Sequence, residues 1–166
     1  MTRLSAFTRN NLNKQGFGNL DDEAKSRSAL PLRFTPGLAT TLIVIGLILQ
    51  SPIWLGAMAL VALSGALLPN GMLLDLVYNL GVRHLFHAPP LPSSPKPRQF
   101  SYFISTFFLA GSAFSFYYGL SVLGFILGGL VVIGSTTLTL TLWCLGSWLY
   151  RLFFGDSVAD SLDLSR

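Results

Sequence analysis

The chain contains a single cysteine, Cys144, which is the residue best suited to redox or sulfur chemistry. A thiol near a membrane surface could relay sulfur or electrons to a partner molecule, although one thiol cannot close a disulfide within the chain. Free cysteine usually behaves as a small, buried, apolar side chain. Cys144 is therefore a candidate redox residue, and a structural role at a helix end is the alternative.

Two histidines, His84 and His87, follow Arg83 closely. Histidines three residues apart can ligate a metal or a tetrapyrrole from one helix face, but the usual carboxylate or cysteine partner is absent nearby. We therefore predict no metal site here. Arg83, His84 and His87 are predicted to anchor the chain at the membrane interface instead.

Hydroxyl side chains recur near the C-terminal end of the chain, at Ser135, Thr136, Thr137, Thr139 and Thr141. They could line a polar path for a small solute. Such hydroxyls also bond back to the carbonyl four residues earlier or across to a neighbouring helix. Transporters normally keep an ionisable group near the middle of the membrane, and no expected span contains one.

Small residues predict close helix packing in the same region. Gly124 and Gly128 form a Gly-x-x-x-Gly step that Gly129 extends, and they are expected to face Gly111 or Ser115 one helix earlier. Small residues at this spacing let two helix backbones approach closely. We predict a packing interface, either within the bundle or against another subunit.

The elements that carry these residues are predicted from composition. Of the 166 residues, 51% are hydrophobic and 11% are charged, whereas about 25% of an ordinary soluble domain is charged. The net charge of +4 comes from residues outside two long uncharged stretches, Phe34 to Leu74 and Gln99 to Tyr150. This pattern predicts an integral membrane protein and excludes a nucleic-acid-binding domain, which would carry a basic stripe on a soluble fold.

Four membrane-spanning helices fit these stretches, because a span needs about 20 apolar residues. Phe34 to Leu68 would form two helices broken at Pro52, and a second pair would cover Phe100 to Tyr118 and Leu120 to Leu142. Trp143, Trp148 and Tyr150 follow the last span as predicted interface anchors.

The predicted fold is thus an all-α membrane protein with four transmembrane helices in two hairpins, each hairpin followed by an amphipathic interfacial stretch. The first such stretch is Met72 to Phe86. The weak likeness of the halves suggests a 2+2 pseudo-repeat. The segments are a polar N-terminal tail (1–32), the first hairpin with its amphipathic helix (33–87), a proline-rich connector (88–98), the second hairpin with its interfacial end (99–154) and a polar C-terminal tail (155–166).

The orientation of the chain in the membrane is predicted from the Lys and Arg residues of its loops and tails. All eleven Lys and Arg residues would lie on one side of a four-span bundle, and the positive-inside rule makes that side the cytoplasm. We therefore expect both termini to be cytoplasmic, in a bacterial inner membrane. The N-terminal tail alone in water is predicted to be mostly disordered, so a partner subunit is the simplest candidate for ordering it.

Four segments resemble the DUF4395 family of small bacterial membrane proteins: Arg33 to Gly37, Leu68-Pro69, Arg98 to Phe100, and Trp143 to Tyr150. The resemblance spans about Leu30 to Phe154. It implies a Cys-x-x-Cys pair in the last segment, a motif suited to thiol–disulfide exchange. Cys144 matches the first cysteine of that pair, but Ser147 occupies the second position.

Three functions remain open from the sequence. The first is a non-catalytic structural or accessory subunit of a larger membrane complex, bound through its N-terminal tail and helix faces. The alternatives are a redox or sulfur-handling protein acting through Cys144 and a small-solute transporter. No cofactor and no catalytic residue is predicted, a bound lipid or pigment is left open, and the expected partners are the bilayer and other membrane subunits.

Overall fold

All regular structure in the described part of the chain is helical. The computed structural model describes residues 5–18, 20–68, 72–86, 90–91 and 94–154. Its elements are α1 (Ala6–Leu12), the π-helical turn η1 (Asn13–Phe17), α2 (Asp22–Ile48), α3 (Pro52–Leu67), α4 (Leu73–Val77), the π-helical turn η2 (Tyr78–Val82), α5 (Arg83–Phe86), α6 (Lys96–Tyr117), α7 (Ser121–Thr141) and α8 (Leu145–Phe154).

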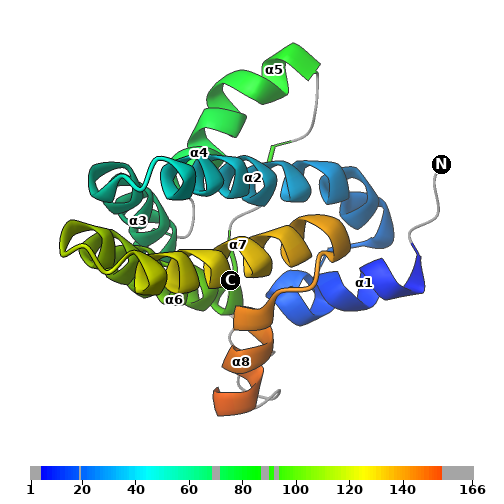
Figure 1. The fold of residues 1–166 in the computed structure, drawn as a ribbon. Helices are drawn as coiled ribbons and strands as arrows, with labels where there is room; N and C mark the ends of the chain where they lie inside the picture. Colours follow the sequence, from blue (N-terminus) through cyan, green and yellow to red (C-terminus); the bar gives the residue numbers. More distant parts are fainter. Residues whose placement is uncertain (1–4, 19, 69–71, 87–89, 92–93, 155–166) are drawn as a thin grey trace.

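Four of these helices, α2, α3, α6 and α7, form the bundle shown in Figure 1. Helix α3 packs along α6, α2 packs along α7, and α6 also packs against α7. The turn between α2 and α3 and the turn between α6 and α7 lie together at the left of Figure 1, and α1 lies at the opposite end. The helices therefore run as two antiparallel pairs.

The breaks between paired helices occur where the sequence predicts them. Ser51 caps α3 by accepting a hydrogen bond of 3.3 Å from the backbone N–H of Trp54, and Pro52 is the first helical residue. Proline suits this position because its missing N–H would have no partner in the first turn. Gln50 and Gly119 adopt positive φ angles of 47° and 75°, which turn the chain sharply.

Three helices, rather than the expected four, are long and apolar enough to cross a membrane. These are α2, α6 and α7, with 27, 22 and 21 residues. Helix α3 is apolar but has 16 residues, so it is about 24 Å long at 1.5 Å per residue. That length falls short of the roughly 30 Å of hydrocarbon in a typical bilayer.

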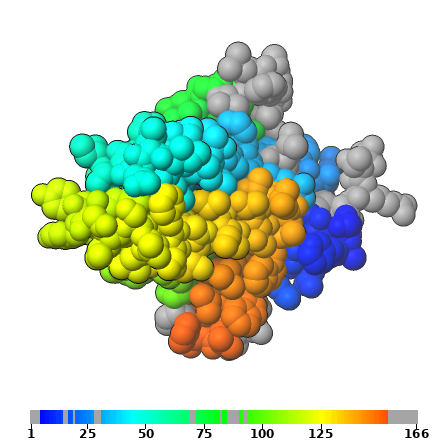
Figure 2. Space-filling view, in the orientation of Figure 1, coloured from blue at the N-terminus to red at the C-terminus, as the bar shows by residue number. Residues whose placement is uncertain are grey.

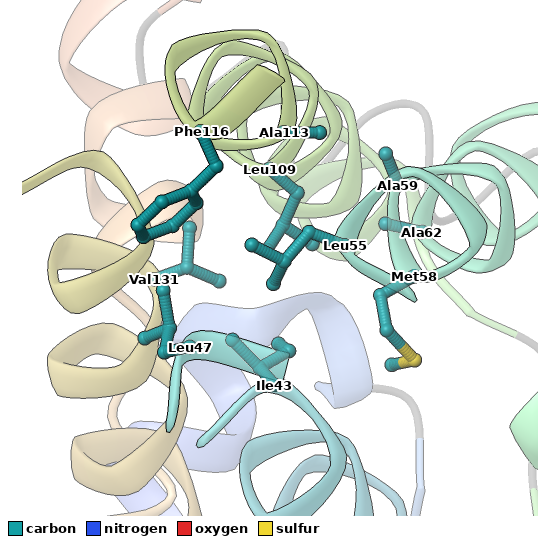
Figure 3. Packing of buried hydrophobic residues seen from close by; sticks show 10 residues of the cluster. All are labelled: Ile43, Leu47, Leu55, Met58, Ala59, Ala62, Leu109, Ala113, Phe116 and Val131. Carbon is teal, nitrogen blue, oxygen red and sulfur yellow. The ribbon is translucent and has the colours of Figure 1, made fainter. Parts of the chain in front are cut away.

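The centre of the bundle is filled by side chains from all four helices (Figure 3). Leu55 of α3 and Leu109 of α6 are 0% and 1% exposed and meet in the middle of this view. Ile43 and Leu47 approach from α2 and Val131 from α7. This cluster connects the two hairpins, so the hairpins form one packed unit.

The N-terminal segment, predicted to be disordered only when alone in water, packs on the rest of the chain in the structure. Leu12 is completely buried, and the Asn11 side-chain amide donates a hydrogen bond of 2.9 Å to the carbonyl of Thr141. Arg151 donates bonds of 3.2 and 3.0 Å to the carbonyls of Asn13 and Lys14. The C-terminal half of the same chain therefore orders this segment, a contact that composition alone does not reveal.

Helix α2 begins ten residues before the expected boundary at 32. Its N-cap is Asp21, whose carboxylate accepts a hydrogen bond of 2.6 Å from the N–H of Ala24. Asp22 and Glu23 in the first turn add favourable charge at the positive end of the helix dipole. The acidic group of the tail is thus a helix start.

The amphipathic stretch after the first hairpin is helical from Leu73 to Phe86, as predicted, but with a π-helical turn in its middle. Its polar residue Asp75 is buried, whereas Leu73, Val77 and Leu80 are exposed. The stretch after the second hairpin, α8, has the same arrangement. There Ser147 is buried, and the exposed side chains are Trp148, Leu152 and Phe153.

Candidate functional site

Cys144 lies in the link between α7 and α8, and the structure gives it a polar neighbour. The residue is 7% exposed, and its Sγ is 2.8 Å from the Oγ of Ser101 on α6. The link exists because Leu142 adopts a left-handed conformation, with a φ of 53°, which ends α7. The chain then turns into α8, and the carbonyl of Cys144 accepts the N–H of Trp148.

Arg98, in the first turn of α6, is the largest fully buried side chain and is 2% exposed. Its Nε donates a hydrogen bond of 2.9 Å to the hydroxyl of Tyr102, one turn further along α6. Its guanidinium carbon also lies 5.7 Å from the centre of the Tyr102 ring, within range of a cation–π interaction. Tyr102 therefore contacts the buried charge in two ways.

The carboxylate of Asp75 on α4 and the thiol of Cys144 lie within electrostatic range of Arg98. Within the described part of the chain, the Oδ1 of Asp75, one terminal nitrogen of Arg98 and the Oγ of Ser147 are buried without a hydrogen-bond partner. Buried charges need compensating polar contacts, because each loses its hydration. We use the name polar cluster for the following residues: Asp75, Arg98, Ser101, Tyr102, Cys144 and Ser147.

A partly open cavity of about 300 Å³ lies beside the polar cluster and is lined by residues of α2, α3, α6, α7 and α8. Ser101, Tyr102 and Cys144 form part of its wall, together with Thr35 of α2. Most of the remaining wall is apolar, with Ile43, Met58, Ile104, Phe108, Val131 and Leu149 among its members. The site is thus an apolar chamber with a polar end.

The predicted packing glycines fall into two groups. A Cβ on Gly128 would collide with Leu47 of α2, and one on Gly124 would lie 2.8 Å from the ring of Phe116. A Cβ on Gly111 would lie 3.0 Å from Leu127. These three glycines pack within the bundle, and a Cβ on Gly129 would meet no described atom within 4 Å.

Ser115 is buried and donates a hydrogen bond of 2.7 Å to the carbonyl of Gly111 on its own helix. Its neighbour Ser112 makes the contact between helices, since its Oγ donates a bond of 2.7 Å to the carbonyl of Gly124. Ser112 was not singled out from the sequence. It shares a helix face with Gly111 and Ser115, which was the available signal.

Four of the five hydroxyl residues singled out on α7, namely Ser135, Thr137, Thr139 and Thr141, form hydrogen bonds in the structure. Thr137, Thr139 and Thr141 each donate to the carbonyl four residues earlier, at 2.7 to 2.8 Å. The Oγ of Ser135 donates to the carbonyl of Val131 at 2.8 Å, and it lies 2.7 Å from the Oγ1 of Thr40 on α2. These hydroxyls therefore satisfy the helix backbone or connect two helices.

The predicted interface residues around η2 and α5 lie away from the polar cluster. His84 is exposed and accepts a hydrogen bond of 3.3 Å from the Nε of Arg83, while His87 lies outside the described residues. Nearby, burial raises the pKa of the Tyr78 phenol, and the Arg83 charge partly opposes this shift. The described residues contain no group of three His, Cys, Asp or Glu side chains placed to hold a metal ion.

The aromatic residues predicted as anchors differ in their burial. Trp148 is exposed and Trp143 is half-buried. Tyr150 is 9% exposed, and its ring packs edge-on against Phe100 at a centroid distance of 5.6 Å. Trp148 thus remains available to a surrounding bilayer, whereas Tyr150 helps to join α8 to α6.

Arg98 and Gly146 are the important residues that sequence reasoning missed. Arg98 was treated as a loop charge and as part of a segment that resembles the family, and neither interpretation gave it a buried site. Tyr102 follows Arg98 by one helical turn and could have signalled a pair on one helix face. A Cβ on Gly146 would collide with the Oγ of Ser101 and lie 2.7 Å from its Cα. Gly146 therefore lets α8 cross α6 closely enough to bring Cys144 beside Ser101.

The fold and the site together define a class of protein: an all-helical bundle with three helices long and apolar enough to cross a membrane, compatible with a multi-pass membrane protein. The chain belongs to the DUF4395 family, since the model of this domain of unknown function matches residues 30–154. The match covers all four bundle helices except the first turns of α2. No curated protein and no solved structure matches the chain.

Proposed function

We propose that this protein is a non-catalytic accessory subunit of a larger membrane complex, built as a four-span module with both ends on the cytoplasmic side. The fourth span would be α3, which at 16 residues requires local thinning of the bilayer. The common position of the two hairpin turns in Figure 1 supports this arrangement. Neither turn carries a Lys or Arg, as the positive-inside rule expects of the outer side.

Helix packing also supports two equivalent hairpins. In a repeat, α2 of the first hairpin would be equivalent to α6 of the second, and α3 would be equivalent to α7. The contact between α3 and α6 should then have an equivalent contact between α7 and α2. The structure contains both contacts. The outward apolar faces of α4 and α8 fit the same correspondence, because each follows its hairpin and would lie in the headgroup region.

The outer face of α7 is the main support for a subunit role. In the most apolar stretch of α7, 17% is buried inside the chain, whereas in the corresponding stretch of α2 the buried share is 44%. Its exposed side chains include Ile126, Leu130 and Ile133, and α7 forms much of the face seen in Figure 2. Gly129 lies among them with open space at its Cβ position.

Glycine in a helix interior costs about 1 kcal/mol relative to alanine. No described neighbour requires a glycine at position 129. A helix of another membrane subunit packed on this face would require it, because small residues allow backbones to approach closely. We therefore propose the Gly129 face of α7 as the docking face.

Native gel electrophoresis in mild detergent tests this function. We expect the wild-type chain to migrate in a species much larger than its 18.0 kDa. Gly129→Phe should release the free chain, whereas Gly56→Phe on the exposed face of α3, where a Cβ also meets no described atom within 4 Å, should not. Migration of the wild-type chain alone, or equal behaviour of the two variants, would contradict the proposal.

Membrane topology is tested separately. Single cysteines placed at Gly119 and at Ser5, in a chain carrying Cys144→Ser, should react with a membrane-impermeant thiol reagent from opposite sides of the membrane. Labelling of both positions from the same side would contradict the four-span arrangement. This result would not depend on any partner protein.

A second candidate function, redox or sulfur handling through Cys144, is favoured by the position of this cysteine in the cavity wall, where a small molecule could reach it. A single thiol needs a second thiol from another molecule to form a disulfide. If Cys144→Ser leaves thiol-dependent growth of the cell unchanged, this candidate loses its support.

A further inference from the structure

The cavity beside the polar cluster has an interior suited to a small molecule. Its volume of about 300 Å³ is at the lower end of the range for ligand pockets, about 300 to 1,000 Å³. Since one water molecule occupies about 30 Å³ of liquid, the space corresponds to about ten non-hydrogen atoms. It would hold a single substituted ring or a short chain.

Three residues of the cavity wall carry polar side-chain atoms at one end: Ser101, Tyr102 and Cys144. The Oγ of Ser101 lies 2.8 Å from the Sγ of Cys144. A serine hydroxyl has two lone pairs, so Ser101 can also accept a hydrogen bond from a hydroxyl group inside the cavity.

The wall also determines the charge of the occupant. None of its described residues is Lys, Arg, Asp, Glu or His. A charged group enclosed there would lose its hydration without a counter-ion in the wall, which is strongly unfavourable. An uncharged hydroxyl group loses much less hydration free energy and can bond to Ser101.

We infer that the cavity between α2, α3, α6, α7 and α8 is a binding site for one small uncharged amphiphile, whose ring or short chain fills the apolar part and whose hydroxyl bonds at the Ser101 end. The surrounding bilayer would supply such a molecule, because it partitions into lipid. This inference is independent of the proposed subunit role.

Cys144 provides a direct readout of occupancy, because it lies in the wall and is the single cysteine of the chain. The full chain is reconstituted in lipid nanodiscs and treated with N-ethylmaleimide, a small uncharged thiol reagent, and labelling is followed by intact mass. The probe is 4-butylphenol, and butylbenzene is the matched compound without a hydroxyl. At ten times its dissociation constant, 4-butylphenol should slow labelling about tenfold.

Butylbenzene at the same concentration should protect Cys144 much less. The chain unfolded in SDS should be labelled equally fast with and without 4-butylphenol, which excludes an effect of the probe on the reagent.

Two glycine variants separate the cavity from the outer surface. Gly134 belongs to the cavity wall, and a Cβ there would meet no described atom within 4 Å. Gly134→Leu should therefore fill the cavity, slow the labelling of Cys144 and abolish further protection by 4-butylphenol. Gly56→Leu on α3 adds the same side chain outside the cavity wall, again with no described atom within 4 Å of the Cβ, and it should leave both rates unchanged. Ala39→Leu, on the α2 wall, is a second filling variant if Gly134→Leu does not fold.

Several results would overturn the inference. Cys144 that resists N-ethylmaleimide in the folded chain would show that the cavity admits no molecule of this size. Labelling that is insensitive to 4-butylphenol would show that the amphiphile does not bind. Equal protection by butylbenzene would contradict a hydrogen bond between the occupant and the wall, and it would show that any apolar molecule of this size can bind.

Discussion

The Nε of Arg98 lies 2.9 Å from the hydroxyl of Tyr102, and this bond links a fully buried cation to the wall of the cavity. Arg98 is close to the end of α6 where α4 and the link before α8 also meet. The guanidinium thus lies where elements from both halves of the chain come together.

Tyr102→Phe should lower the free energy of unfolding by about 2 kcal/mol, because a hydrogen bond to a buried charge is lost. SDS titration in mixed micelles measures this change. Tyr117→Phe is the matched control, since Tyr117 is 72% exposed at the other end of α6, and it should change the stability by less than about 0.5 kcal/mol. Equal effects of the two substitutions would contradict the role of the Arg98–Tyr102 bond.

Asp75 and Arg98 should be energetically coupled. Arg98→Gln should lower the free energy of unfolding by about 2 kcal/mol, because it removes the charged donor of the hydrogen bond to Tyr102. Combined with Asp75→Asn, it should cost at least about 1 kcal/mol less than the sum of the two single changes. A double-mutant cycle in the same SDS titration gives this coupling energy.

The exposed ion pair of Arg9 and Asp22 is the control for that cycle. Its N–O distance is 2.7 Å, and its side chains are 49% and 55% exposed. Water screens such a pair, so its coupling energy should not exceed about 0.5 kcal/mol. Additive effects of Asp75→Asn and Arg98→Gln, equal to those of this exposed pair, would contradict the electrostatic link in the polar cluster.

Gly146→Ala should destabilise the protein by about 1 to 3 kcal/mol, because the added methyl group meets the backbone of Ser101 and forces α8 away from α6. The labelling rate of Cys144 by N-ethylmaleimide should rise as the link opens. Gly81→Ala, in η2, adds a methyl group with no described atom within 4 Å, and it should leave the labelling rate unchanged. An unaltered rate in Gly146→Ala would contradict the close crossing.

Leu12→Ala should loosen the N-terminal segment. Leu12 is completely buried, and removing a buried leucine side chain costs about 2 to 5 kcal/mol. The segment before α2 should then be cut faster by trypsin, at Arg9 or Lys14. Phe7→Ala is the control, because Phe7 is 62% exposed, and cutting that is equally slow in both variants would contradict the docking of α1.

Sequence reasoning succeeds best where a local rule decides the structure. Hydrophobic length, proline chemistry and glycine predict the hairpin turns at Gln50 and Gly119 and the helix after Met72. They also predict the two long apolar helices expected over Phe100–Tyr118 and Leu120–Leu142, which the structure has as α6 and α7. Each rule involves residues close together in the chain, so no tertiary contact can easily override it. The start of α2 at Asp22 also had a local signal, namely the acidic residues that follow Asp21. The prediction for this segment used only its polar composition and therefore did not use that signal.

The candidate site depends on contacts between distant segments. Cys144 and Ser101 are 43 residues apart, and Asn11 and Thr141 are 130 apart. Leu142 ends α7 in a left-handed conformation, and Gly146 lets α8 approach α6, so that Cys144 lies beside Ser101. No pattern in the neighbouring sequence predicts this arrangement. Arg98 likewise resembles any loop charge until Tyr102 and α4 enclose it.

The sequence by itself determined an apolar, all-helical chain broken at two tight turns, because hydrophobic periodicity and helix breakers act over a few residues. Only the tertiary structure decided which polar groups are buried together, where the cavity lies, and that the N-terminal segment docks on the C-terminal half. Those outcomes depend on how helices far apart in the chain cross, and the crossing is set by side-chain shape across the whole bundle.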